Sequence, residues 1–213
     1  MLKIEALEVT PFVQNCRILF CSETSRCVVI DPGGDSEKIL GHLAGANRTL
    51  HEIWLTHSHL DHCGGVKKIK AATGARLIGH PDERVMRENV TQICRMYGLP
   101  LGVLDDCPEP DQFISGGEIL ELGNFKFRVL FTPGHSPGHL CFYCAQENLL
   151  IAGDTLFAGS IGRTDLPGGD HNRLIKSIRD EILTLPGETR VLSGHGPDTT
   201  VAREARSNPF LKE

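Results

Sequence analysis

The chain has 213 residues, of which 40% are hydrophobic and 23% are charged, and its formal net charge is -5. This length and composition suit one folded domain with an ample core and exclude a disordered chain. No apolar run approaches the roughly 20 residues that span a bilayer, so we expect no membrane segment. The charges contain no basic run that could follow a phosphate backbone, which argues against a nucleic-acid partner.

The N-terminus and the cysteines indicate a cellular setting. Glu5 and Glu8 stand where a signal peptide would need an uninterrupted apolar segment, so we expect no export. The eight cysteines lie mostly inside apolar, strand-like runs of a chain that is too long to need disulfide staples. We therefore predict reduced thiols and a cytoplasmic location.

Short strands dominate the first part of the chain. Three apolar runs of strand length predict an antiparallel meander: residues 4–9, 16–21 and 27–30. A turn begins at Asp31, and Asp35 is predicted to N-cap the helix that follows. A further short strand, residues 53–55, runs into a polar loop, and a helix is expected after Gly64 and Gly65.

The second part of the chain repeats this mixture of strands and helices. Later strands are predicted at residues 118–122, 125–131, 139–144, 149–152 and 191–192, and helices at 174–182 and 201–206. The segment 81–111 has helical pieces and several prolines, and we interpret it as a lid or substrate wall. Two β-rich halves with flanking helices predict a layered α/β sandwich, formed by one domain over residues 1–213.

The loop after the strand at 53–55 carries a dense group of metal-ligand side chains. His57, His59, Asp61 and His62 fall within six positions. Imidazole nitrogen and carboxylate oxygen are typical zinc ligands, and a loop can turn all four side chains inward. A lone histidine is more often a structural residue that is satisfied by hydrogen bonds. Four such residues together favour a metal site.

Three later loops place further ligand-type residues directly after a glycine at the end of a predicted strand. They are His135, Asp154 and His195. Loops that converge at strand ends are a common way for layered proteins to assemble a site. We therefore predict that these residues join the loop at 57–62 in one metal centre.

Taken together, these motifs closely resemble those of the metallo-β-lactamase superfamily, and within it the glyoxalase II-like proteins, or hydroxyacylglutathione hydrolases. The resemblance covers nearly the whole chain and is carried by residues 29–34, 57–62, 132–139, 153–157, 162–165 and 194–196. Two-domain glyoxalase II enzymes add a helical C-terminal domain, whereas this chain ends at Glu213. The match is therefore closer to the compact, single-domain prokaryotic type.

The resemblance implies a fold and a ligand set. The expected fold is the four-layer αβ/βα sandwich of the metallo-β-lactamase type. By resemblance, two divalent metal ions are expected, with zinc favoured and iron or manganese as alternatives. The implied ligands are His57, His59 and His135 for the first ion, Asp61, His62 and His195 for the second, and Asp154 as the bridge.

The resemblance also implies an activity. The expected reaction is hydrolysis of S-D-lactoylglutathione or a related 2-hydroxyacyl thioester, a small-molecule substrate, by a hydroxide held between the metals. Asp61 would be both a ligand and the catalytic residue that orients the proton of the hydroxide. Arg163 would bind a carboxylate of the glutathione moiety, although a purely structural pair with Asp165 is an equal alternative.

Other functions stay open at this point. The first alternative is a persulfide dioxygenase, which resembles the chain at residues 162–165 but uses a single iron. A lactonase with the same dizinc site is the second. A non-catalytic binding module would require the loss of a ligand, and all seven ligand positions are filled. The sequence does not indicate an oligomeric state.

Two further residues are interpreted as possible supports of the site, and two cysteines as buried structural residues. His139 begins a predicted strand, so its ring is expected to support the ligand loop without binding the metal. Asp31 is expected either to accept a hydrogen bond from a ligand histidine or to cap a turn. Cys141 and Cys144 spell C-x-x-C but face opposite sides of a strand, which favours burial over a redox pair.

Overall fold

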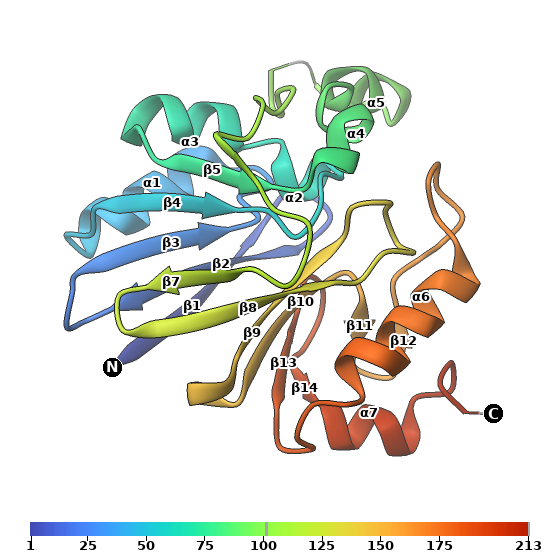
Figure 1. Ribbon diagram of the computed structural model, residues 1–213. Helices are drawn as coiled ribbons and strands as arrows, with labels where there is room; N and C mark the ends of the chain where they lie inside the picture. Colours follow the sequence, from blue (N-terminus) through green and yellow to red (C-terminus); the bar gives the residue numbers. More distant parts are fainter. Residues whose placement is uncertain (101, 213) are drawn as a thin grey trace. The chain divides into compact units, whose positions relative to one another are not determined.

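The computed structural model describes residues 1–100 and 102–212, and these residues form two compact units. The first unit comprises Met1–Ile114 and Leu122–Phe125, and the second comprises Ser115–Glu121 and the chain from Lys126 onward. Each unit contains one large sheet with its own helices (Figure 1). The single domain over residues 1–213 stays a prediction.

The sheet of the first unit has six strands in the order β1-β2-β3-β4-β5-β6. Their bounds are β1 Leu2–Val9, β2 Gln14–Cys21, β3 Arg26–Ile30, β4 Leu50–Trp54, β5 Arg76–Gly79 and β6 Gln112–Phe113. The first three strands pair antiparallel, which confirms the predicted meander. From β3 to β6 the pairs are parallel. Each connection between these strands contains a helix and carries the chain back to the end of the sheet at which the previous strand began.

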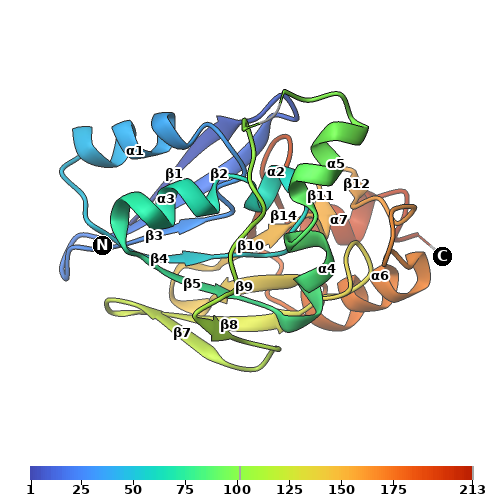
Figure 2. The same cartoon turned by 90° about the horizontal axis from the view of Figure 1, so that it is seen from above.

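Two helices of the first unit, α1 (Ser36–Gly45) and α3 (Val66–Thr73), lie side by side on one face of the sheet (Figure 2). They bury the apolar residues Ile39, Leu43 and Ile69 in the core of this unit. The remaining helical segments of the unit are α2 Leu60–Cys63, η1 Pro81–Glu83, α4 Arg84–Arg87 and α5 Val90–Met96. The helices expected before and after the polar loop are therefore present.

Asp35 is the N-cap residue of α1, as predicted, but its side chain does not cap the helix. Its backbone is left-handed, with φ of 46°, and its side chain makes no capping bond. Its Oδ2 instead accepts a hydrogen bond from the backbone N–H of Thr10 at 2.9 Å. The carboxylate therefore ties the turn after β1 to the start of α1.

The second sheet has the order β14-β13-β10-β9-β8-β7. Its strands are β7 Ile119–Leu122, β8 Phe125–Phe131, β9 Leu140–Cys144, β10 Leu149–Gly153, β13 Arg190–Ser193 and β14 Thr199–Thr200. A short hairpin is made by β11 (Leu156–Phe157) and β12 (Ser160–Ile161). The helical segments are η2 Ala145–Glu147, α6 His171–Ser177, its π-helical continuation η3 Ile178–Ile182, and α7 Val201–Ser207. Leu174, Ile178 and Ile182 form the predicted buried face of the helix.

Strand direction gathers the polar loops of each unit at one edge of its sheet. In the first unit, β3, β4 and β5 are parallel neighbours, so the residues that follow them share the carboxyl edge. In the second unit, β10 and β13 are parallel, and β9 runs antiparallel to both β8 and β10. The loops after β8, β10 and β13 therefore leave from the same edge, which is where α/β sheets commonly form sites.

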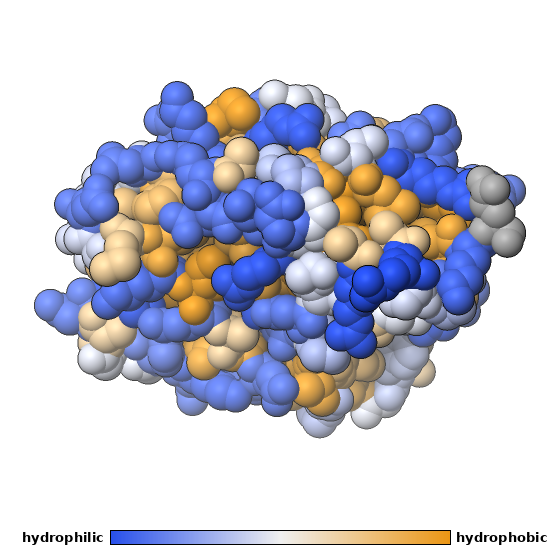
Figure 3. Space-filling view, turned by 90° about the horizontal axis from the view of Figure 1, so that it is seen from below, coloured by the Kyte–Doolittle hydropathy of each residue, from blue (hydrophilic) through white to orange (hydrophobic). Residues whose placement is uncertain are grey.

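The cysteines and the surface agree with the composition. All eight cysteines are buried free thiols, as predicted. The face drawn in Figure 3 carries hydrophilic side chains with hydrophobic patches between them. Within residues 1–100 and 102–212, no helix has both the length and the apolar character needed to cross a membrane.

The ion pair of Glu5 gives a pH-dependent prediction. Two hydrogen bonds from Arg48 lower the pKa of Glu5 to about 2, and His42 also bonds to this carboxylate. A lowered pKa in the folded chain stabilises it above the unfolded-state pKa of about 4.3, and this stabilisation is lost as pH falls through about 2. We expect Glu5→Gln to lower the free energy of unfolding by about 1 kcal/mol at pH 7.

The measurement is urea denaturation of the wild type and the variant between pH 7 and pH 2. The difference in unfolding free energy should shrink as the pH drops below about 4.5. Glu37→Gln, a change at an exposed residue of α1, is the matched control and should produce no such difference. A constant difference across the whole range would contradict the prediction.

Candidate metal centre

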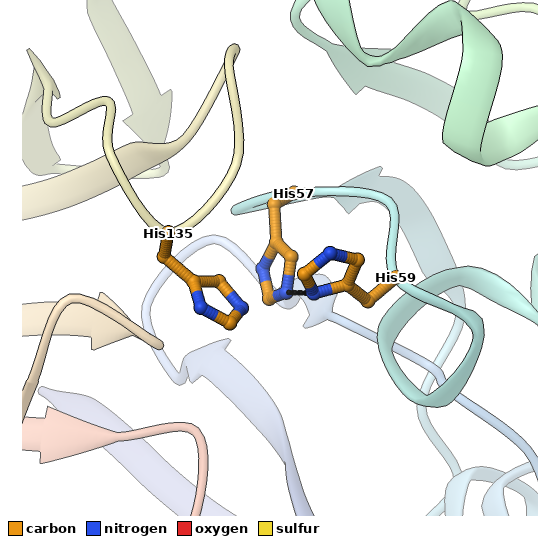
Figure 4. Close-up of side chains that lie close together, drawn as sticks. All are labelled: His57, His59 and His135. Carbon is orange, nitrogen blue, oxygen red and sulfur yellow. Dashed lines mark hydrogen bonds between the residues drawn. The ribbon is translucent and has the colours of Figure 1, made fainter. Parts of the chain in front are cut away.

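The loop after β4 holds the first group of predicted ligands. His57, His59 and His62 are buried, and the side chain of Asp61 is 15% exposed. Nε2 of His57 lies 3.1 Å from Nδ1 of His59, and the two rings meet edge to face (Figure 4). His62 and Asp61 lie on α2, whose first turn begins directly after His59. The four residues that the sequence singled out are therefore gathered within one unit.

The carboxylate of Asp31 organises this loop. It accepts hydrogen bonds from the backbone N–H of Thr56 at 2.7 Å, from the hydroxyl of Thr56 at 2.6 Å and from Nδ1 of His62 at 3.0 Å. Asp31 has φ of 51°, a conformation that is uncommon outside glycine and that places the side chain toward the loop. Asp31 therefore bonds to His62, one of the predicted ligands, and this hydrogen bond was expected.

The same carboxylate fixes the proton positions on two histidines. An ionised carboxylate only accepts hydrogen bonds, so His62 must donate from Nδ1 and Thr56 must give its single hydroxyl proton to Asp31. Oγ1 of Thr56 then accepts from Nδ1 of His57, which lies 3.0 Å away. In the neutral rings, Nε2 of both His57 and His62 therefore carries a lone pair.

In the second unit, the loops after β8 and β10 bring His135 and Asp154 together. Nδ1 of His135 donates to the backbone carbonyl of Arg163 at 2.8 Å. A carbonyl cannot donate, so Nε2 of the neutral ring carries the lone pair, and it lies 3.6 Å from Oδ2 of Asp154. Nε2 of His195, in the loop after β13, lies 3.5 Å from the same oxygen. These three predicted residues are thus gathered within the second unit.

His139 supports the loop of Asp154 through a hydrogen bond to its backbone, as predicted. Its ring is fully buried, and its Nε2 accepts a hydrogen bond from the backbone N–H of Asp154 at 3.1 Å. Nδ1 of the ring lies 3.0 Å from the hydroxyls of Thr132 and Thr155. Since Nε2 accepts, Nδ1 of the neutral ring carries the proton. His139 therefore fixes the loop of Asp154 through its backbone.

The donor sets of both units fit divalent metal ions. In each unit an imidazole nitrogen lies near a carboxylate oxygen. Nε2 of His62 is 3.9 Å from Oδ2 of Asp61, and Nε2 of His135 is 3.6 Å from Oδ2 of Asp154. Two electron-rich atoms at such distances repel each other unless a cation lies between them or nearby. Nitrogen and carboxylate oxygen are the ligands of zinc and of related divalent ions.

Arg163 makes the structural pair that the sequence left open. Its guanidinium donates to both carboxylate oxygens of Asp165 at 2.8 and 2.7 Å, and both side chains are more than half exposed. These bonds lower the pKa of Asp165 to about 2. Because the pair is exposed, it leaves the guanidinium accessible to a solute.

Two supporting residues of the first unit were not predicted from the sequence. The hydroxyl of Thr56 connects Asp31 to His57, because it donates to the carboxylate and accepts from Nδ1 of the ring. Glu83, which is 2% exposed, accepts a hydrogen bond from the backbone N–H of Ser58 at 2.7 Å. Thr56 directly precedes the histidine loop, so its position offered a signal. Glu83 follows β5, the neighbour of β4, and only the strand order could have revealed it.

Comparison with known proteins places the chain in a family. The model of the metallo-beta-lactamase superfamily matches residues 9–195. The chain belongs to the metallo-β-lactamase superfamily. The predicted metallo-β-lactamase-type fold is thereby confirmed, and the chain is a metal-dependent hydrolase of this superfamily.

Three similar proteins cover almost the full chain. The hydroxyacylglutathione hydrolase GloC of Haemophilus influenzae is 39% identical over 99% of this chain and 98% of its own length. The B3 metallo-beta-lactamase BLEG-1 is 37% identical with a TM-score of 0.91, over 99% of this chain and all of its own. TTHA1623, crystallised in a di-iron-bound form, is 38% identical with a TM-score of 0.88, over 97% and 100% of the two chains.

At two glycines the backbone packs directly against the backbone of a predicted metal ligand. A Cβ atom on Gly33 would lie 1.5 Å from the carbonyl oxygen of Asp61, and one on Gly162 would lie 1.9 Å from that of Asp154. We expect Gly33→Ala and Gly162→Ala each to lower the free energy of unfolding by about 2 kcal/mol or more.

Gly41→Ala is the matched control, because a Cβ atom there meets nothing within 4 Å and the residue lies inside α1. Its helix propensity should raise the stability by up to about 1 kcal/mol. Urea denaturation of the three variants measures these changes. Equal stability of all three would show that the backbone at the ligands tolerates a side chain.

Proposed function

We propose that this hydrolase is a dinuclear thioesterase of the glyoxalase II type, whose substrate is S-D-lactoylglutathione or a related 2-hydroxyacyl thioester. One observation carries the proposal: Nδ1 of His57, His62 and His135 is in each case occupied by a hydrogen bond, which leaves Nε2 of each neutral ring to bind an ion. The full-length similarity to the hydroxyacylglutathione hydrolase GloC supports the choice of a thioester.

The proposed ligand set keeps the assignments implied by the family motifs. His57, His59 and His135 would bind one ion, Asp61, His62 and His195 the other, and Asp154 both. Zinc is the proposed ion because imidazole and carboxylate donors suit it. The di-iron-bound form of TTHA1623 supports iron as the alternative.

When bound, two divalent cations supply a hydroxide nucleophile near neutral pH and polarise the thioester carbonyl. The chain itself holds the groups around this reaction in place. Asp31 keeps the rings of His57 and His62 in one orientation, and His139 keeps Asp154 in place. The carboxylate of Asp61, which is partly exposed, would accept the proton of the attacking water or orient it.

β-Lactam hydrolysis is the second candidate activity, since BLEG-1 is described as a B3 metallo-beta-lactamase and covers the same length. An exposed amide of this kind would meet the same nucleophile as a thioester. A lactone and a persulfide, the latter with a single iron and oxygen, are the other substrates to be tested.

Metal content and turnover test the proposal directly. We expect the purified protein to hold about two divalent ions per chain and to hydrolyse S-D-lactoylglutathione. Removal of the ions by a chelator should abolish turnover, and added zinc should restore it. Elemental analysis and the absorbance of the thioester measure both quantities.

Each other outcome selects a different function. One iron per chain with oxygen uptake on glutathione persulfide would replace the thioesterase with a dioxygenase. Turnover of a β-lactam or a lactone with no turnover of thioesters would keep the metal centre and reject the substrate. Hydrolysis that survives complete metal removal would reject the whole proposal.

Arg163 is proposed to bind a carboxylate of the thioester substrate. Loss of a charge-assisted hydrogen bond costs about 1.5–3 kcal/mol, so we expect Arg163→Ala to raise KM about tenfold with a smaller change in kcat. Arg206→Ala, which removes an exposed arginine from α7, should leave both constants unchanged. An unchanged KM in Arg163→Ala would leave this residue only its pair with Asp165.

A further inference from the structure

Glu83 is a buried carboxylate that lies outside the set of proposed metal ligands. It ends the short 3-10 helix η1, and the side chain of His80 caps this helix by accepting from the backbone N–H of Asp82. The exposed fraction of Glu83 is 2%, and its Oε2 accepts from the N–H of Ser58 at 2.7 Å. A buried carboxylate is costly, so its contact with this particular loop calls for a role.

Ser58 is the residue between two ligand histidines. Both histidines turn their rings toward each other, one on each side of Ser58 in the sequence. Their rings are 4.7 Å apart, and Nε2 of the first lies 3.1 Å from Nδ1 of the second (Figure 4). The direction of the Ser58 peptide group controls the rotation of the backbone between them. A hydrogen bond to that N–H therefore holds both rings.

The loop is anchored from the strands on both sides of β4. Asp31, which follows β3, accepts the N–H of Thr56 at 2.7 Å, and Glu83, which follows β5 and His80, accepts the N–H of Ser58. The strands β3 and β5 are the two parallel neighbours of β4. Two buried carboxylates thus bind alternate backbone amides of the histidine loop.

We propose that Glu83 is a positioning residue that holds His57 and His59 in the orientation that binds a metal ion. The inference rests on the proposed metal centre. Hydrogen bonds to an ionised acceptor are about twice as strong as neutral ones, so the carboxylate holds the Ser58 amide more firmly than an amide oxygen would. Its negative charge in a buried environment also favours a cation bound to the neighbouring rings.

The experiment compares Glu83→Gln and Glu83→Ala with the wild type. Glutamine keeps an acceptor oxygen but loses the charge, whereas alanine loses both. The matched control is Asp111→Asn, because Asp111 also accepts a backbone N–H in the first unit, from Leu77 at 2.7 Å. The zinc dissociation constant is measured by competition with a chromophoric chelator, and the cobalt-substituted proteins give absorption spectra of the ligand environment.

We expect zinc to bind about tenfold more weakly to Glu83→Gln and up to about 100-fold more weakly to Glu83→Ala. The cobalt spectrum should change in both, and the control should match the wild type within about twofold. In the metal-free protein, hydrogen exchange at the Ser58 amide should be at least about tenfold faster in Glu83→Ala.

Three results would overturn the inference. The first is a zinc affinity in both Glu83 variants that equals that of the wild type. The second is a loss of zinc affinity in Asp111→Asn as large as that in the Glu83 variants. The third is hydrogen exchange at the Ser58 amide that is as slow in Glu83→Ala as in the wild type. If Glu83→Ala does not fold, Glu83→Gln decides, since its shape matches that of glutamate. A wild-type protein that binds no zinc or iron would instead refute the metal centre, while the exchange measurement would still test the anchoring of the loop.

Discussion

The loop of proposed metal ligands in the first unit depends on one buried carboxylate. Asp31 accepts hydrogen bonds from the backbone and hydroxyl of Thr56 and from His62. Without these bonds neither nitrogen of the His57 and His62 rings would be preferred for the proton, and a proton on Nε2 would block that nitrogen from binding a cation. The left-handed backbone of Asp31 costs about 1 kcal/mol or more. The fold accepts this strain because three hydrogen bonds oppose it.

The second unit reaches the same result with different groups. A backbone carbonyl, that of Arg163, fixes the proton of His135, and a neutral imidazole, that of His139, accepts from the backbone of Asp154. Asp31 and His139 stand at strand ends that share an edge with the predicted ligands, whereas the carbonyl of Arg163 follows the short strand β12. Strand direction therefore explains why ligands and their supports, which are far apart in sequence, can bond to one another.

The sequence predicted the parts of the molecule that depend on local pattern. Alternating apolar runs located the strands at 4–9 and 16–21, and the density of donors at 57–62 located the histidine loop. The resemblance to a family correctly indicated the fold class. His139 was recognised as a supporting residue because it begins a predicted strand shortly after His135, and Asp31 because it ends a predicted strand at a turn.

The residues that escaped prediction depend on strand order. Glu83 and Ser58 are 25 residues apart, and their bond exists because β5 pairs in parallel with β4 at Trp54 and Ile78. Asp35 has the sequence signal of a helix cap, but the nearby N–H of Thr10 competes for its carboxylate. A local pattern cannot reveal which of two donors is nearer once the chain has folded.

The polar groups that orient the predicted ligands also lower the stability of the metal-free fold. His57, His62, Asp31 and Glu83 are all at most 3% exposed, and each buried ionisable group costs free energy that its hydrogen bonds only partly offset. A divalent cation that binds the folded chain but not the unfolded one stabilises it by mass action. Binding of a metal ion at this site would therefore be coupled to folding. The buried carboxylates that orient the histidines would attract the bound cation, and this attraction would offset the cost of burying them.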